Sequence, residues 1–236
     1  MRRTRGPRVD GDGRAYAGSQ LQIQIYANRR GRELSEHVCD VLPGLSSDTP
    51  IHWVSPVEAE KFVEYQDSMF LRKLGLTEHS SALRTFWPRG GPVWDALAVV
   101  VGTPQGSILV EAKSHAPEVY GSGCQAKGES RRKIEAALAE TKQWLGVSSD
   151  TDWMGPLYQS ANRIAHLYFL REVLNIPAWL VNVYFVDDPH SPTTREQWET
   201  AIGQVRTDLG LTKFEVPHMG EVFLKARDRS ELLGNI

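Results

Sequence analysis

Residues 93–115 constrain the fold of this chain more than any other stretch. They read as two apolar, largely β-branched runs joined by GTPQG at 102–106, a segment whose glycines and proline are typical of a turn. Three charges interrupt these runs: Asp95 in the first, and Glu111 and Lys113, spaced as E-x-K, in the second. The stretch therefore predicts a β-hairpin that carries charge where burial is expected.

A geometric argument places the three charges on one patch. If the loop is centred on Pro104, the numbers of paired residues sum to 208, and Asp95 lies opposite Lys113. Because side chains alternate between the two faces of a strand, Glu111 shares that face, and His115 follows just beyond it. A slip of one residue would turn Asp95 to the other face, so the prediction depends on the register.

Composition and charge narrow the class of protein. The chain has 236 residues and a net charge of −2, so contacts with nucleic acid would have to come from local basic patches. No apolar run is long enough for a membrane span, and the first twenty residues lack the apolar core of a signal peptide. Two cysteines, Cys39 and Cys124, form neither a disulfide framework nor a zinc quartet. We expect a cytoplasmic protein without a membrane partner.

The fold expected from the apolar pattern is α/β, with a central mixed β-sheet flanked by helices on both faces. Both runs of the hairpin are apolar on both faces away from the charges, which is typical of central strands. The organisation predicted is a flexible basic tail over residues 1–20 and a single domain over residues 21–236. The other predicted strands are 21–27, 51–54, 81–87, 178–186 and 221–224, and the predicted helices are 32–42, 55–74, 130–145, 156–174 and about 195–209.

Two capping boxes are predicted at helix starts. Ser55-Pro56-Val57-Glu58 would open the helix 55–74, which assigns Glu58 to capping and leaves Glu60 and Glu64 one turn apart on one face. Thr193 to Glu196 would open the helix near residue 195. Asp187 and Asp188 precede it and are interpreted as turn residues rather than metal ligands.

Polar residues on two other predicted helices are candidates for binding. Within the largely apolar helix 156–174, four polar residues fall at i, i+3, i+4 and i+7 and would either line a site or form a satisfied structural network. They are Gln159, Asn162, Arg163 and His166. Arg131 and Arg132 lie in the first turn of the helix 130–145, against the helix dipole, so they would either meet an anionic ligand or form an exposed basic turn.

The patch on the hairpin has the composition of a divalent-metal site. Carboxylates such as Asp95 and Glu111 suit Mg²⁺ or Mn²⁺, and a lysine beside the cation can serve an attacking water or stabilise charge at phosphorus. The alternative is a structural Asp–Lys pair at a strand end. A second E-x-K at Glu140-Thr141-Lys142 falls in a predicted helix, where i and i+2 do not face each other.

These residues resemble the signature of the restriction-endonuclease-like superfamily, PD-(D/E)xK. Asp95 matches the first half, although Trp94 stands before it and Pro92 three positions ahead, and Glu111-Ala112-Lys113 matches the second half. The resemblance implies an αβββαβ core spanning roughly residues 51–188. It also implies metal ligands at Asp95, Glu111 and the Ala112 carbonyl, a catalytic lysine at Lys113, and a further glutamate from the preceding helix, for which Glu64 is preferred over Glu60.

The expected function is a Mg²⁺- or Mn²⁺-dependent nuclease that hydrolyses phosphodiester bonds, with DNA favoured over RNA and a role in repair or defence. Gln159, Asn162, Arg163, His166, Arg131 and Arg132 would bind the substrate. A non-catalytic nucleic-acid-binding or interaction protein on the same fold, and a hydrolase of another phosphorylated substrate, are the alternatives. A homodimer is an open alternative to a monomer.

Overall fold

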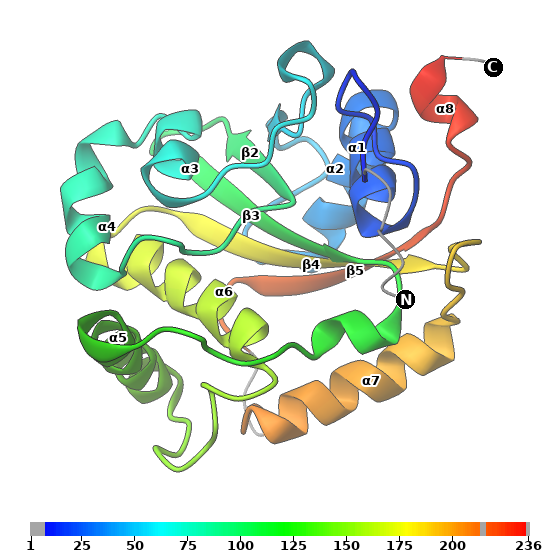
Figure 1. Cartoon of the computed structure of the whole chain (residues 1–236). Coiled ribbons are helices and arrows are strands. Elements are labelled where there is room, and N and C mark those ends of the chain that lie inside the picture. Colours follow the sequence, from blue (N-terminus) through cyan, green and yellow to red (C-terminus); the bar gives the residue numbers. More distant parts are fainter. Residues whose placement is uncertain (1–7, 213–215, 235–236) are drawn as a thin grey trace.

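A five-stranded mixed β-sheet forms the centre of the molecule (Figure 1). The computed structural model describes residues 8–212 and 216–234. The strands are β1 (Ile51–Ser55), β2 (Ala96–Val100), β3 (Gly106–Lys113), β4 (Ala178–Val186) and β5 (Met219–Lys225), which lie side by side in that order. β1, β2 and β3 form an antiparallel meander, and β4 and β5 run parallel to β3. The α/β class and the mixed sheet predicted from the sequence are confirmed.

Helices cover both faces of the sheet. The longer ones are α1 (Gly18–Arg29), α2 (Gly31–Val41), α5 (Gly128–Leu145), α6 (Tyr158–Tyr168) and α7 (Arg195–Asp208). The shorter ones are η1 (Glu58–Glu60), α3 (Asp67–Lys73), η2 (Thr77–His79), α4 (Ser80–Phe86), η3 (Ala116–Val119), the π-helix η4 (Phe169–Val173) and α8 (Ser230–Leu233). In Figure 1, α1 and α2 lie on the upper side of the sheet, and α5, α6 and α7 lie on the lower side.

The alternation of side chains along the strands divides the core into two layers. Leu97, Leu109 and Leu180 point to the side of α5 and α6. Their neighbours along the strands, such as Val110 and Val181, point to the side of α1 and α2. This two-sided burial is what the apolar hairpin predicts, because a strand covered on both faces needs apolar side chains on both.

Several predicted elements are confirmed, with small shifts at their ends. Strands at 51–54, 178–186 and 221–224, the two runs of the hairpin, and helices near 32–42, 130–145, 156–174 and 195–209 all appear. The capping box of α7 lies one residue later than predicted. Thr194 is its N-cap, and the Thr194 amide donates to Gln197 Oε1 at 2.8 Å.

The strand predicted at 21–27 is wrong, because these residues belong to α1. The alternation of apolar and polar residues indicates the two faces of a strand, yet Gln22 and Gln24 are both buried. The Gln22 side chain donates to the Arg227 carbonyl at 2.9 Å, and the Gln24 side chain donates to the Gly13 carbonyl at 3.0 Å. Hydrogen bonds to flanking backbone satisfy these amides inside a helix, so polarity does not indicate exposure here.

The helix predicted at 55–74 is also wrong, except for α3 at its end. Ser55 belongs to β1, and its hydroxyl donates to the Val63 carbonyl at 3.0 Å instead of capping a helix. Lys61 and Phe62 have φ values of 53° and 57°, which end the single turn η1. Glu58 forms ion pairs with Arg29 and Arg14 rather than completing a capping box.

Two further predictions need correction. The strand at 81–87 is wrong, because Ser80–Phe86 form α4; Leu83 and the C-cap residue Trp87 lie four residues apart and are both buried. The predicted tail is wrong over residues 8–20, because Val9 pairs with Ala15, Ala15 is fully buried and α1 begins at Gly18. Residues 1–7 of that tail lie outside the described residues.

Candidate functional site

Backbone pairing brings three carboxylates to the end of the central strands. In the hairpin, paired residues sum to 206, as in Ala96 with Val110, rather than the predicted 208. The shift is two residues. The regular pairing ends at Ala96, and the Asp95 amide donates to the Val110 carbonyl at 3.2 Å, so Asp95 adjoins Glu111 instead of Lys113. Just before β2, Tyr65 forms an antiparallel bridge with Trp94, and the Tyr65 carbonyl accepts from the Trp94 amide at 3.0 Å. This bridge sets Glu64 beside Asp95.

Glu111 is the buried centre of the cluster, with 7% of its surface exposed. One of its carboxylate oxygens accepts a hydrogen bond from Lys113 Nζ, and the other accepts from Arg163 Nε at 2.6 Å. Burial alone would raise the pKa of Glu111, but the charges of Arg163 and Lys113 outweigh it and hold that pKa below its ordinary value. The pKa of Lys113 is raised, since Glu111 and Asp95 outweigh the opposing effect of burial.

Asp95 lies at the start of β2, where its side chain reaches the backbone of β3. Its Oδ2 accepts from the Ala112 amide at 2.7 Å. Burial and the neighbouring charge of Glu111 raise the pKa of Asp95 to about 8, with a further contribution from Glu64. The positive charge of Lys113 does not offset these effects on Asp95, and a bound cation would favour the ionised form of its carboxyl group.

The structure distinguishes Glu64 from Glu60. Glu60 pairs with Lys73 and accepts from the Tyr65 hydroxyl at 2.6 Å, so it is held away from the cluster. Glu64 accepts from Gln20 Nε2 at 3.2 Å. Burial raises the pKa of Glu64, and the nearby charge of Glu111 adds to this effect. Glu64 thus belongs to the cluster, although it lies on a loop and not on the helix that was predicted.

Ala112 presents a backbone group at the same place. β2 pairs with β3 only as far as Val110, so Ala112 lies beyond the end of β2 and its amide bonds Asp95 instead of a strand neighbour. The amide and carbonyl of one strand residue point to the same side. The Ala112 carbonyl therefore faces the side where β2 has ended, as expected for the ligand predicted at this position.

Three of the four polar residues predicted on α6 reach the cluster or its supports. The Gln159 side chain accepts from Lys113 Nζ at 3.4 Å. Arg163 is 5% exposed, and its other two nitrogens donate to Asn162 Oδ1 at 2.8 Å and to the Val93 carbonyl at 2.9 Å. Its guanidinium also lies 5.1 Å from the centre of the Trp94 ring. Arg163 is thus a buried support for Glu111, which differs from its predicted contact with substrate.

His166, the fourth of these residues, lies away from the carboxylates. It is 1% exposed, its Nδ1 lies 2.8 Å from the Asn162 carbonyl, and four aromatic rings surround it. These rings belong to Phe70, Phe86, Trp87 and Trp94. Direct binding of substrate by His166 does not fit this burial. Burial lowers its pKa to about 4, with opposing contributions from the Asn162 carbonyl and Asp67 and a smaller lowering by Arg163.

The buried neutral His166 predicts a loss of stability in mild acid. Its pKa lies near 6.5 in the unfolded chain and about 4 in the folded one, so its stabilising contribution is complete above pH 6.5 and declines as the pH falls to 4. A shift of this size corresponds to roughly 3 kcal/mol of unfolding free energy. Urea unfolding at pH 7.5 and 4.5 should show a smaller difference for His166→Gln than for the wild type. His190→Gln, which removes an exposed histidine, should retain the wild-type difference.

Arg131 and Arg132, predicted to bind substrate, are exposed on α5. Arg131 pairs with Glu135 one turn along, at 2.8 Å. The neighbouring Lys133 donates to the Arg84 carbonyl at 3.0 Å, which places this turn next to α4. No hydrogen bond or ion pair within the described part of the chain joins either arginine to the carboxylate cluster. The structure thus does not bring them to the site.

Sequence reasoning missed several supports of the site. Gln20 holds Glu64 from α1, a segment that was assigned to a tail and a strand. Asn182 lies in register with Glu111 on β3 and with Glu221 on β5, which extends a polar row across three strands. Asn182 interrupts the apolar run AWLVNVYFV, and this interruption is the signal that would have identified it.

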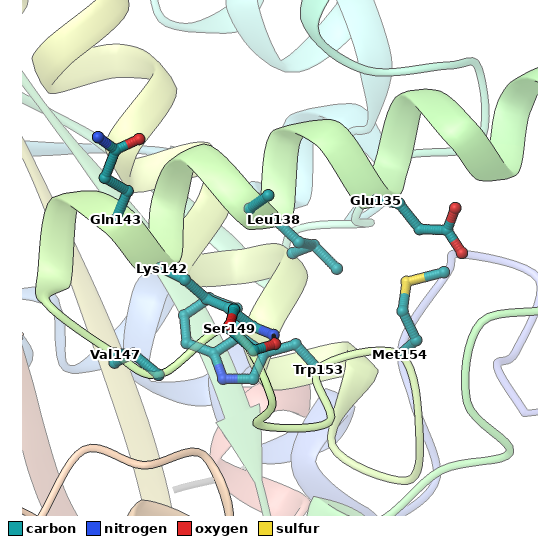
Figure 2. Close-up of a pocket in the computed structure, with 9 residues that line it drawn as sticks. Glu135, Leu138, Lys142, Gln143, Val147, Ser149, Trp153 and Met154 are labelled. Atoms are coloured by element: carbon teal, nitrogen blue, oxygen red, sulfur yellow. Dashed lines mark hydrogen bonds between the residues drawn. The ribbon is translucent and has the colours of Figure 1, made fainter.

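A cavity that contains none of the predicted site residues lies beside α5, away from the carboxylate cluster. It has a volume of about 460 Å³ and is formed by α5 and the loop that follows it. Figure 2 shows Lys142, Ser149 and Trp153 gathered on one side, with Glu135 and Met154 on the other. Lys142 donates to the Ser149 carbonyl at 3.0 Å and so braces this loop. None of the residues of the carboxylate cluster lines this cavity.

The donors at the strand ends fit a magnesium ion. Within residues 8–212 and 216–234, no three His, Cys, Asp or Glu side chains are arranged to enclose a metal. Mg²⁺ does not require such a cage, since it commonly binds one or two carboxylates and completes its shell with water and substrate oxygens. Asp95, Glu111 and the Ala112 carbonyl form a set of this kind, and the raised pKa of Asp95 is the behaviour expected of a carboxyl group without its counter-ion.

Comparison of the chain with protein-family models, curated proteins and solved structures finds no match. Among the helices of the described residues, none has the length and apolarity required to cross a membrane.

Proposed function

We propose that this protein is a metal-dependent nuclease. The observation that carries the proposal is the convergence of Glu64, Asp95, Glu111 and Lys113 at one end of the sheet, supported by Arg163. Three carboxylates in a small, largely desolvated space repel one another, and such an arrangement is costly unless it serves a function. Acidic ligands for a divalent cation and a nearby lysine are a combination that suits metal-assisted phosphodiester hydrolysis.

The order of elements also supports the resemblance to the restriction-endonuclease-like superfamily. Along the chain, helices α1 and α2 precede the antiparallel meander β1–β2–β3, and helices α5 and α6 precede β4. This order resembles αβββαβ, although it starts at α1 and not at residue 55, and α3 and α4 are inserted between β1 and β2. The E-x-K segment lies on β3 and Asp95 lies at the start of the adjacent β2. The family assignment remains part of the proposal.

The residues of the cluster have separate roles in this proposal. Asp95, Glu111 and the Ala112 carbonyl would hold Mg²⁺ or Mn²⁺, which would polarise the phosphodiester and lower the pKa of an attacking water. Lys113 orients that water and stabilises negative charge at phosphorus. Arg163 fixes the carboxylate of Glu111, and Glu64 adds a carboxylate beside Asp95. Gln159, exposed and next to Lys113, is the member of the polar stripe placed to meet substrate.

The test is cleavage by the purified protein. DNA, the favoured substrate, and RNA of the same sequence should be incubated with Mg²⁺, with Mn²⁺ and with EDTA. Cleavage of DNA that depends on the metal and stops in EDTA is the expected result, because hydrolysis at neutral pH needs the activated water. Ca²⁺ serves as a control for metal binding without efficient catalysis. Absence of cleavage of either nucleic acid under all metal conditions would contradict the proposal.

One observation favours a second candidate function. Both carboxylate oxygens of Glu111 are already held by cationic side chains, Lys113 and Arg163. A site whose ligand is neutralised by the protein itself is compatible with a non-catalytic nucleic-acid-binding protein on the same fold. Equal binding of DNA in Mg²⁺ and in EDTA, without cleavage, would support this function. The cytoplasmic localisation and the alternative of a homodimer stay predictions.

A further inference from the structure

A second, polar cavity adjoins the carboxylate cluster. It has a volume of about 340 Å³ and lies between α3 and the segment that leads from α4 to β2. The lining residues that matter here are Gln66, Asp67, Met69, Arg84, Trp87 and Arg89. A volume of this size is within the range that accommodates a small organic ligand.

Two chain segments connect this cavity directly to the candidate site. Gln66 follows Glu64 by two residues, and the segment from Trp87 to Asp95 joins the back wall of the cavity to the cluster. α6 forms a shared wall, because Arg163 bonds Glu111 and His166 packs edge-on against Trp87, with their ring centres 4.9 Å apart.

Trp87 and Asp67 bring a buried donor, unpartnered within the described ranges, and a carboxylate close together in the wall of the cavity. Trp87 is 2% exposed, and its indole N–H has no hydrogen-bond partner among the residues that the structure describes. A Cβ placed on Gly91 would lie 3.5 Å from Trp87 Cδ1, the atom next to that N–H, and 3.2 Å from Asp67 Oδ1. Amides of Gly90 and Gly91 donate to the Asp67 carboxylate at 3.2 and 2.9 Å and fix its orientation. A buried unpaired donor of this kind calls for a ligand or a water.

The rim of the cavity is positively charged. Arg84 and Arg89 are exposed, and neither takes part in an ion pair formed within the described ranges of the chain. Exposed guanidinium groups without acidic partners are suited to phosphate, which they can contact through two parallel hydrogen bonds. The cavity therefore combines a polar interior suited to a heterocyclic base with a rim suited to phosphate.

We propose that this cavity binds an unpaired nucleotide next to the bond that is cleaved. The base would enter toward Trp87 and Asp67, and its phosphate would meet Arg84 and Arg89. A base in a duplex is stacked and paired and cannot enter such a cavity without being extruded, so the substrate class is single-stranded or locally unpaired nucleic acid. This inference rests on the proposed nuclease function, but binding tests it without cleavage.

The experiment is a binding measurement in EDTA. Fluorescence anisotropy should be recorded for a labelled single strand of twelve nucleotides and for the same sequence as a blunt duplex. The single strand is expected to bind at least about tenfold more tightly, since stacking or insertion of one base contributes this much or more. An abasic nucleotide moved along the strand should weaken binding about tenfold at one position. Equal binding of the two forms, or an abasic effect at no position, would overturn the proposal.

Matched variants assign the effect to this cavity. Arg84→Ala/Arg89→Ala should weaken binding of the single strand about tenfold or more, whereas Arg32→Ala/Arg195→Ala, which removes the same charge from exposed i,i+4 pairs on α2 and α7, should change it less than twofold. Equal effects of the two double variants would overturn the proposal. If the Arg84→Ala/Arg89→Ala variant alone loses binding but no cleavage is found, the nuclease proposal is wrong and the proposal of nucleotide binding in this cavity is supported. If cleavage is found but the two double variants bind the single strand equally, the nuclease proposal is supported and the proposal of nucleotide binding in this cavity is wrong.

Discussion

Replacement of Lys113 by methionine or Glu111 by glutamine is expected to reduce metal-dependent cleavage about a hundredfold to a thousandfold. In the proposed mechanism Lys113 stabilises charge at phosphorus, and Glu111 is the carboxylate to which both Lys113 and Arg163 bind. Single groups that stabilise a transition state commonly contribute two to three orders of magnitude in rate. The measurement is the initial rate of cleavage of the preferred nucleic acid at saturating Mg²⁺.

The chain contains its own control for this prediction. Glu140-Thr141-Lys142 repeats the E-x-K spacing on α5, where Glu140 is exposed and remote from the cluster. Glu140→Gln should therefore cleave within about twofold of the wild type, because spacing without convergence forms no site. Circular dichroism and urea unfolding should show that the Lys113 and Glu111 variants are folded under the assay conditions. A folded Lys113→Met variant with wild-type activity would sink the proposed mechanism.

Replacement of Arg163 by methionine is expected to lower the free energy of unfolding by about 3–5 kcal/mol, since removal of one partner leaves a buried charge uncompensated. Arg163 is 5% exposed and donates to Glu111, Asn162 and Val93, so three acceptors lose a donor together. Urea unfolding at pH 7.5 measures the change. Arg131→Met, which breaks the exposed pair with Glu135, should cost less than about 1 kcal/mol.

A double-mutant cycle separates the free energy of the Glu111–Arg163 ion pair from the effect of lost packing. Glu111→Gln removes the charge that Arg163 neutralises, so Glu111→Gln/Arg163→Met should be more stable than the sum of the two single effects predicts. We expect a coupling free energy of roughly 1–3 kcal/mol. Strict additivity would mean that the two side chains act independently, and it would contradict the view of Arg163 as the support of Glu111.

The sequence predicted the centre of the sheet because burial on both faces leaves a simple apolar pattern. β2, β3 and β4 are of this kind, and they were placed within a few residues of their true ends. The prediction failed where polar residues are buried and bonded to backbone elsewhere in the chain, as in α1, whose glutamines donate to the carbonyls of Arg227 and Gly13. It failed again at Ser55, whose hydroxyl is used by the Val63 carbonyl and not by a helix start.

The structure brings Asp95, Glu111 and Lys113 together although the predicted hairpin register is wrong. The true pairing differs by two residues from the predicted one, yet the Asp95 amide bonds Val110 and its carboxylate bonds the Ala112 amide, which keeps Asp95 beside Glu111. Glu64 was chosen from a helix that does not form, yet the Tyr65–Trp94 bridge brings it to the cluster. Arg163 and His166 were recognised as unusual on an apolar helix, but the pattern could not show that both are buried.

The site is assembled from segments that lie far apart in the sequence. Its contacts join Gln20 to Glu64 and Glu111 to Arg163, residues separated by 44 and 52 positions in the sequence. Contacts of such long range form late in folding, because each requires the closure of a large loop. Proteolytic fragments should therefore lack the site altogether, and during refolding from urea cleavage activity should return only with the last kinetic phase.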